Sequence, residues 1–79
     1  MAGAARHLRK RSFALAGHRT SVALEPAFWA ALEAAAVRRG LSLAALVTRL
    51  DLARGEAAQP LASALRVFAL AEAGGTGTG

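Results

Sequence analysis

The sequence predicts a mostly α-helical fold with one short β-strand per chain. Residues 19–24, Arg-Thr-Ser-Val-Ala-Leu, alternate between two kinds of side chain, which is the period-2 pattern of a half-buried strand. After Pro26, apolar residues instead recur every three to four positions, in segments that end near Gly40 and Gly55. This spacing is typical of helices. The expected order is strand, helix, tight turn, helix and a short third helix.

Size and composition favour association of two copies. The chain has 79 residues and no cysteine, so we expect at most one domain and no disulfide. A single copy of this size buries a small core and is only marginally stable. His7 and His18 lie far apart in the sequence, whereas a structural zinc site needs about four ligands at close spacing. We therefore expect no metal and no other cofactor.

The net charge of +5 is concentrated at the N-terminal end. Residues 1–24 hold five of the ten Lys and Arg residues and no acid, and all five acids follow them. A basic segment on a neutral body suits a polyanionic partner such as nucleic acid, although a solubilising tail is the alternative. No apolar run reaches the roughly 18 residues that span a bilayer. The apolar stretch before Gly17 is too short for an export signal, so we expect a cytoplasmic protein without a membrane partner.

The N-terminal region leaves one alternative open. Residues 1–10 show no periodicity and are expected to form a flexible basic arm, which precedes a folded domain over residues 11–72. Residues 11–16 can form a short strand, with the break at Gly17-His18, because glycine tolerates the positive φ of a tight turn. This segment either pairs with residues 19–24 as a hairpin or stands apart as an arm. Residues 73–79 are expected to be a disordered, glycine-rich tail.

The first two helices carry signals at their ends. Pro26 is expected at the first helical position, where its missing N–H costs nothing, and Glu25 places negative charge beside the positive end of the helix. Gly40 follows two arginines and is expected to end this helix. The Ser42 hydroxyl is expected to cap the next helix.

The third helix is expected to start at Pro60 and to place Leu61, Leu65 and Phe68 on one face. In one interpretation this helix caps a dimer. In the other it presents Arg66 and Phe68 to a separate protein partner.

In this order and spacing, these segments resemble the ribbon-helix-helix superfamily of bacterial repressors and antitoxins. They are most similar to a short bacterial ribbon-helix-helix domain family that is common in alphaproteobacteria. The segments that carry the resemblance span roughly residues 10–70 and are Lys10-Arg11-Ser12, Gly17-His18-Arg19-Thr20-Ser21-Val22, Phe28-Trp29, Arg39-Gly40-Leu41-Ser42-Leu43 and Ser63-Ala64-Leu65-Arg66-Val67-Phe68.

The resemblance implies a fold and a function. In the superfamily, two chains pair one strand each into an antiparallel β-ribbon that enters the DNA major groove, and four helices interlock beneath it. It therefore implies an intertwined homodimer with an intermolecular ribbon and, in this chain, an extra C-terminal helix. The pairing is physically reasonable, because a lone strand leaves its backbone N–H and C=O groups without partners.

The outward strand face would then read base edges through Arg19, Ser21 and Ala23. Arginine can donate two hydrogen bonds to guanine, and serine can bond to several bases. Ala23 departs from the superfamily, which often has a polar or basic side chain there, and alanine offers only contact with a thymine methyl.

Two further groups of residues are expected around this strand face. Phosphate contacts are assigned to the N-terminus of the second helix and to basic residues near the strand: Arg9, Lys10, Arg11, His18, Ser42, Leu43 and Ala44. The dimer core is assigned to apolar positions at strand or helix spacing: Thr20, Val22, Leu24, Phe28, Trp29, Leu32, Leu46, Val47 and Leu50.

The residues also bear on which class of function to expect. An enzyme is not expected, since no serine, histidine and carboxylate stand in plausible register and the carboxylates do not cluster. A membrane-surface peptide is disfavoured, because the basic residues gather in the arm and strand and not along a helix. The favoured function is a dimeric DNA-binding transcriptional regulator. The rival is a small dimeric protein-interaction module, antitoxin-like or scaffolding, without sequence-specific DNA binding.

Overall fold

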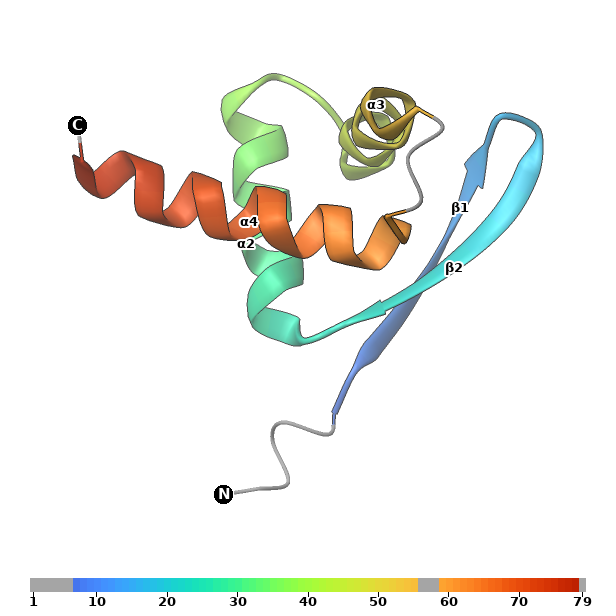
Figure 1. The fold of residues 1–79 in the computed structure, drawn as a ribbon, viewed down its shortest axis with the longest axis horizontal. Coiled ribbons are helices and arrows are strands. Elements are labelled where there is room, and N and C mark those ends of the chain that lie inside the picture. Colours follow the sequence, from blue (N-terminus) through green and yellow to red (C-terminus); the bar gives the residue numbers. More distant parts are fainter. Residues whose placement is uncertain (1–6, 56–58, 79) are drawn as a thin grey trace.

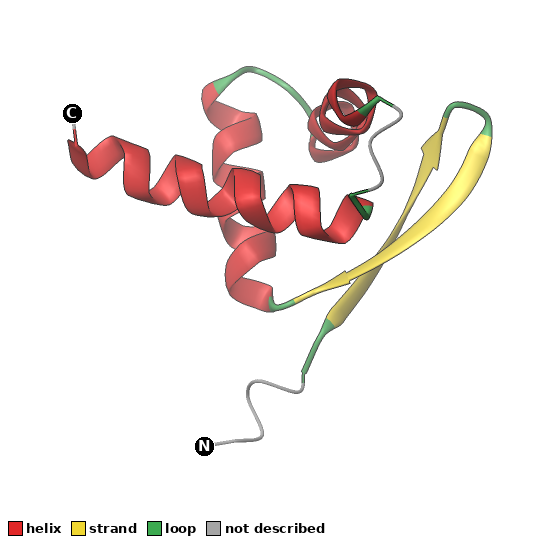
Figure 2. Cartoon of the chain, viewed as in Figure 1, coloured by secondary structure: helices red, strands yellow, loops and turns green. Residues whose placement is uncertain are grey.

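A computed structural model describes residues 7–55 and 59–78. The chain forms a β-hairpin followed by three helices, and the hairpin extends to one side of the helices (Figures 1 and 2). The order of elements is β1 (Arg9–Leu15), β2 (His18–Leu24), α2 (Pro26–Arg38), α3 (Leu43–Arg54) and α4 (Leu61–Thr78). The expected sequence of a main strand and three helices is therefore present.

The expectation of one strand per chain is wrong, because β1 pairs with β2 in the same chain. The pairing is antiparallel and runs from Arg9 opposite Leu24 to Leu15 opposite His18. Residues 11–16 thus form a hairpin with the main strand. Arg9 and Lys10 were expected in the arm but lie in β1, because their backbones belong to the ladder. Residues 1–6 of the expected arm lie outside the described residues.

A two-residue turn closes the hairpin. Ala16 and Gly17 both have positive φ, 51° and 84°, as a type I′ turn requires, and this turn matches the twist of the flanking strands. Glycine adopts such a φ without cost, whereas alanine there is strained by roughly 1–2 kcal/mol. The strain at Ala16 is offset by the ladder that the turn permits.

The helix ends follow the expected signals. α2 begins at Pro26, and Gly40 follows its end with a φ of 68°. The Ser42 hydroxyl accepts a hydrogen bond from the Ala45 N–H at 3.0 Å, so Ser42 is the N-cap of α3. Gly55 follows α3 with a φ of 59°.

The C-terminal segment differs from the expectation of a disordered tail after residue 72. α4 continues to Thr78, and only Gly79 of the expected tail lies outside the described residues. A helix that has already formed gains one hydrogen bond for each residue it adds, so it can extend through residues of poor helix propensity. Residues 73–78, which were expected to form a tail, therefore extend the helix.

A hydrophobic core closes within a single chain. The hairpin and all three helices contribute to it: Phe13, Leu15, Val22 and Leu24 from the hairpin, Trp29, Leu32, Ala35 and Ala36 from α2, Leu46 and Val47 from α3, and Leu61, Leu65 and Ala69 from α4. Six residues of the expected dimer core are thus buried by their own chain, and Thr20, Phe28 and Leu50 are half-buried. Burial of these side chains does not require a second copy.

Trp29 joins α2 to the hairpin. Its indole Nε1–H donates to the Arg9 carbonyl oxygen at 2.8 Å, and its ring lies 6.0 Å from the Phe13 ring, centroid to centroid. The side chain is only 2% exposed. Burial of the ring with its N–H bonded is the ordinary role of a core tryptophan.

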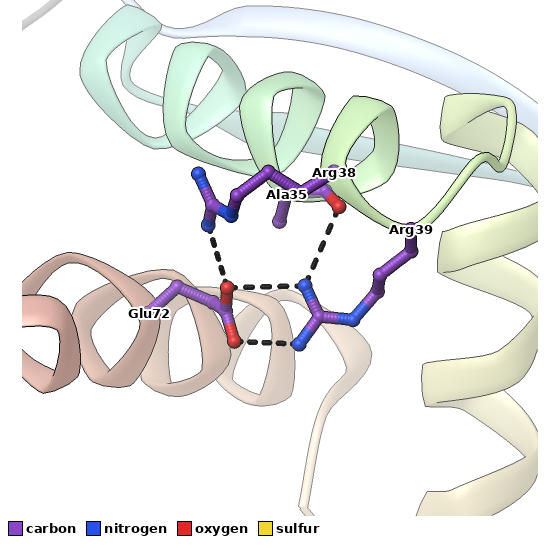
Figure 3. Close-up of polar contacts among 4 residues, drawn as sticks. All are labelled: Ala35, Arg38, Arg39 and Glu72. Carbon is purple, nitrogen blue, oxygen red and sulfur yellow. Dashed lines mark hydrogen bonds and ion pairs between the residues drawn. The ribbon is translucent and has the colours of Figure 1, made fainter.

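Charged contacts hold α4 against α2. Glu72 accepts hydrogen bonds from Arg38 at 2.6 Å and from the two terminal nitrogens of Arg39 at 2.7 and 3.0 Å (Figure 3). The Arg39 guanidinium also lies 5.2 Å from the Phe68 ring centroid. At the other end of α4, Arg66 bonds to Glu25 at 3.2 Å. Arg66 and Phe68, which one interpretation assigned to a partner protein, therefore have partners within the chain.

The Glu72 contacts predict a pH-dependent stability. Hydrogen bonds from Arg39 and then Arg38 lower the pKa of Glu72 from 4.5 to about 2. Because the folded-state pKa is depressed, the stabilisation is fully present above pH 4.5 and is lost as the pH falls toward 2. We expect Glu72→Gln to be less stable than the wild type at neutral pH, with the difference shrinking over this acid range. Urea unfolding of both proteins from pH 7 to pH 2 measures this difference in the free energy of unfolding. A difference that stayed constant over the whole range would contradict the stabilising role of the ionised Glu72.

Candidate nucleic-acid interface

The pairing register places six side chains on one face of the hairpin. Arg19, Ser21 and Ala23 alternate with buried residues along β2, and they lie opposite Ala14, Ser12 and Lys10 of β1. The hydroxyl oxygens of Ser12 and Ser21 are 3.1 Å apart, as expected for side chains on the same face. We call this set the outer face: Lys10, Ser12, Ala14, Arg19, Ser21 and Ala23.

The outer face points away from the core. Its side chains are exposed except for Ala23, which is half-buried. On the opposite side, Phe13, Leu15, Val22 and Leu24 are at most 8% exposed. Burial of this apolar side fixes which face of each strand points outward, because a shift of one residue in the pairing register would move every side chain to the opposite face. The three residues expected to read bases therefore share one accessible surface.

The cations of the outer face have no acidic partner among the described residues. The four described acids pair with arginines elsewhere: Glu25 with Arg66, Glu33 with Arg11, Asp51 with Arg54, and Glu72 with Arg38 and Arg39. Glu56 lies outside the described residues. No described carboxylate pairs with Lys10 or Arg19, so these two cations give the outer face a positive potential.

Strand alternation separates the three basic residues that were expected at phosphates. Lys10 lies on the outer face, whereas Arg9 and Arg11 share the side that faces the helices. The Arg11 guanidinium bonds to Glu33 at 2.7 Å and lies 5.1 Å from the Trp29 ring centroid. Arg11 is therefore engaged within the chain. His18 is exposed at the turn end of β2, on the side of Arg9 and Arg11.

The start of α3 keeps the features expected of a phosphate contact. Ser42 and Ala44 are exposed and Leu43 is half-buried. Within residues 7–55 and 59–78, no hydrogen bond uses the N–H groups of Leu43 and Ala44, as is normal in the first turn of a helix. The Ser42 hydroxyl already acts as the cap, so the backbone amides of this turn are the donors that remain.

Sequence reasoning missed two members of the outer face, Ser12 and Ala14. Both follow from the hairpin register, since they lie opposite Ser21 and Arg19. The available signal was the alternation of Phe13 and Leu15 with small or polar neighbours, which marks a strand with one buried side.

Other kinds of site find little support in the described part of the chain. No three His, Asp or Glu side chains there lie close enough together to hold a metal ion. Over the same residues, no helix combines the length and the apolar character that crossing a membrane requires.

Comparisons with known proteins agree with this architecture. The profile of one protein family, described as a ribbon-helix-helix domain, matches residues 8–73. The solved structure of an uncharacterized protein from Bordetella pertussis Tohama I is similar, with a TM-score of 0.82 and 36% sequence identity. The similarity covers 96% of this chain but 63% of the solved chain, so this chain spans less than two thirds of that protein. None of the curated proteins matches this chain.

Proposed function

Because this chain belongs to the ribbon-helix-helix domain family, we propose that it binds DNA as a dimer and regulates transcription. In this proposal the part of the outer face that lies on β2 enters the major groove. The observation that carries the proposal is the exposed outer face, on which Lys10 and Arg19 have no acidic partner among the described residues while the described acids pair elsewhere. Such a surface attracts phosphate and can approach base edges.

The free edge of β2 supports pairing with a second copy. The two-residue turn makes Leu15 and His18 a hydrogen-bonded pair, and such pairs alternate along an antiparallel ladder. The peptide groups of Arg19, Ser21 and Ala23 therefore point away from β1. In the described residues the sheet has two strands, so this edge has no strand partner in the chain. A second copy can pair with it about a two-fold axis.

The paired β2 strands would place two copies of each reading residue in one groove. The major groove is about 12 Å wide and admits a two-stranded ribbon. Arg19 would donate to guanine O6 and N7, Ser21 would bond to a base edge, and Ala23 would contact a thymine methyl. The N-terminus of α3, at Ser42, would contact phosphate and fix the position of the ribbon without reading sequence.

Substitution of Arg19 tests base reading. We expect Arg19→Ala to lose roughly 1–3 kcal/mol of binding free energy on the preferred duplex and much less on unrelated duplexes. The preferred duplex is first identified by selection among random sites. Fluorescence anisotropy titrations of both duplexes at several salt concentrations then measure the loss of binding free energy. Wild-type affinity should fall steeply as salt rises, because phosphate contacts release counterions.

The control for this experiment is Arg38→Ala. It removes one cation beside α4, and Glu72 keeps its contacts with Arg39. Equal losses for Arg19→Ala on every duplex would make Arg19 a phosphate contact. Absence of binding to any duplex at low salt would refute DNA binding.

A specific observation favours a second candidate, a protein-interaction module. A hollow of about 300 Å³ lies between α3 and α4 and is lined by residues that include Leu50, Val67 and Phe68. Val67 is 58% exposed, and Leu52 of α3 is 70% exposed. Apolar surface of this kind can contact another protein. A folded dimer without affinity for DNA would favour this function.

A further inference from the structure

We propose that β1 forms a second, outer row of DNA contacts, in which Lys10 binds phosphate at each rim of the major groove. This inference rests on the proposed dimeric DNA binding and adds to it the role of the flanking strand.

The width of the dimer sheet is the first step. Pairing of two β2 edges gives the strand order β1, β2, β2, β1 across the two copies, since β1 already occupies the other edge of β2. Neighbouring strands lie about 4.8 Å apart, so the two β2 strands are about 5 Å apart and the two β1 strands about 14 Å. The groove is about 12 Å wide. The β2 strands therefore fit inside it, and the β1 strands lie over its rims, where the phosphates are.

The side chains of β1 suit this position. Its outer row is Lys10, Ser12 and Ala14, so the two short residues allow the strand to approach the DNA backbone. Lys10 is the one long side chain of the row and is exposed. It has no ion pair within the described residues, so no ion pair must be broken when it binds phosphate.

Ala23 makes room for Lys10 across the strands. The two residues face each other in the ladder, and side chains in such pairs lie about 4.5–5.5 Å apart at Cβ. The small Ala23 does not crowd the lysine stem, which is free to turn outward to the rim of the groove. The basic group that β2 lacks at Ala23 is thus supplied by β1, where it reaches a phosphate and reads no base.

Arg9 provides a matched control in the same strand. It precedes Lys10, is also exposed and also has no ion pair among the described residues, but its side chain lies on the opposite side of the hairpin. The Arg9 contact with Trp29 uses the backbone carbonyl, so truncation of the side chain preserves it. If net charge alone determined the affinity for DNA, truncation of Arg9 and truncation of Lys10 would lower it equally.

The experiment measures duplex binding by Lys10→Ala, Lys10→Arg and Arg9→Ala with fluorescence anisotropy at several salt concentrations. For Lys10→Ala we expect the affinity to fall by the same factor on preferred and on unrelated duplexes. Each lost phosphate contact makes the slope of log affinity against log salt less steep by about 0.9. The dimer has two copies of Lys10, so its slope should become less steep by roughly 2. Lys10→Arg should retain the wild-type slope. Arg9→Ala removes a charge from the opposite side of the hairpin, so it should weaken binding and flatten the slope less than Lys10→Ala does.

Three results would overturn the inference. Equal effects of Lys10→Ala and Arg9→Ala would show that Lys10 acts only through net charge. If Lys10→Ala kept the wild-type affinity for DNA while Arg19→Ala bound more weakly, the outer row would be rejected and the proposed function would stand. A wild-type protein that binds no duplex at low salt would reject both.

Discussion

Truncation of Leu65 to alanine is expected to lower the free energy of unfolding by about 2–5 kcal/mol, the range for a buried leucine. Leu65 lies in α4 and is 0% exposed. The loss combines the transfer of the side chain from water with the cavity that remains, and it is a large share of the roughly 5–15 kcal/mol that stabilises a small domain. Urea unfolding followed by circular dichroism measures it through the shift of the midpoint.

Leu70→Ala is the matched control in the same helix. Leu70 is 61% exposed, so its truncation should change stability by no more than about 0.5 kcal/mol. If both variants were equally mild, α4 would not belong to the core, and its role would be to present side chains to a partner. A large effect confined to Leu65 would make the third helix part of the folding unit.

Replacement of Ser21 by proline is expected to convert the proposed dimer into monomers. Ser21 is the middle residue of β2, and its N–H is expected to point to the free edge. Proline removes that donor and places its ring where the second copy would pair, whereas the hydrogen bonds to β1 come from the neighbouring residues. Sedimentation at micromolar concentration measures the mass, and circular dichroism checks that the fold persists.

Ser12→Pro is the control on the other edge. Ser12 faces Ser21 across the strands, so both variants lose the same contact between hydroxyls, and proline strains both strands in the same way. Only the Ser21 variant blocks the edge proposed for dimerisation. A wild-type protein that sediments as a folded monomer, or a dimer that survives Ser21→Pro, would contradict pairing through β2.

Local patterns predicted much of the fold. The alternation in residues 19–24 predicted β2, Pro26 predicted the start of α2, and Ser42 predicted the cap of α3. These predictions succeeded because each depends on neighbouring residues alone: the period of burial in a strand, the missing N–H of proline, and a hydroxyl close to the first helical amides.

The sequence did not decide whether residues 11–16 pair with residues 19–24 or stand apart as an arm. Its turn is Ala16-Gly17, which lacks the strong signal of Asn-Gly, and alanine must adopt a strained φ of 51° there. Three of the first four residues of β1 are basic, so its strand pattern is visible only around Phe13 and Leu15. Pairing of β1 with β2 depends on burial of those two residues beneath the helices, which a local pattern does not contain.

The sequence by itself determined the kinds of element, their order and the excess of positive charge before residue 25, because these depend on side-chain type and on spacing along the chain. Only the tertiary structure decided which cations are available. The hairpin register turns Lys10 and Arg19 outward, and packing brings Glu33 to Arg11 and Glu72 to Arg38 and Arg39. Charges far apart in the sequence neutralise each other only when folding brings them within a few ångströms, so the surface that faces a partner is a property of the packed chain.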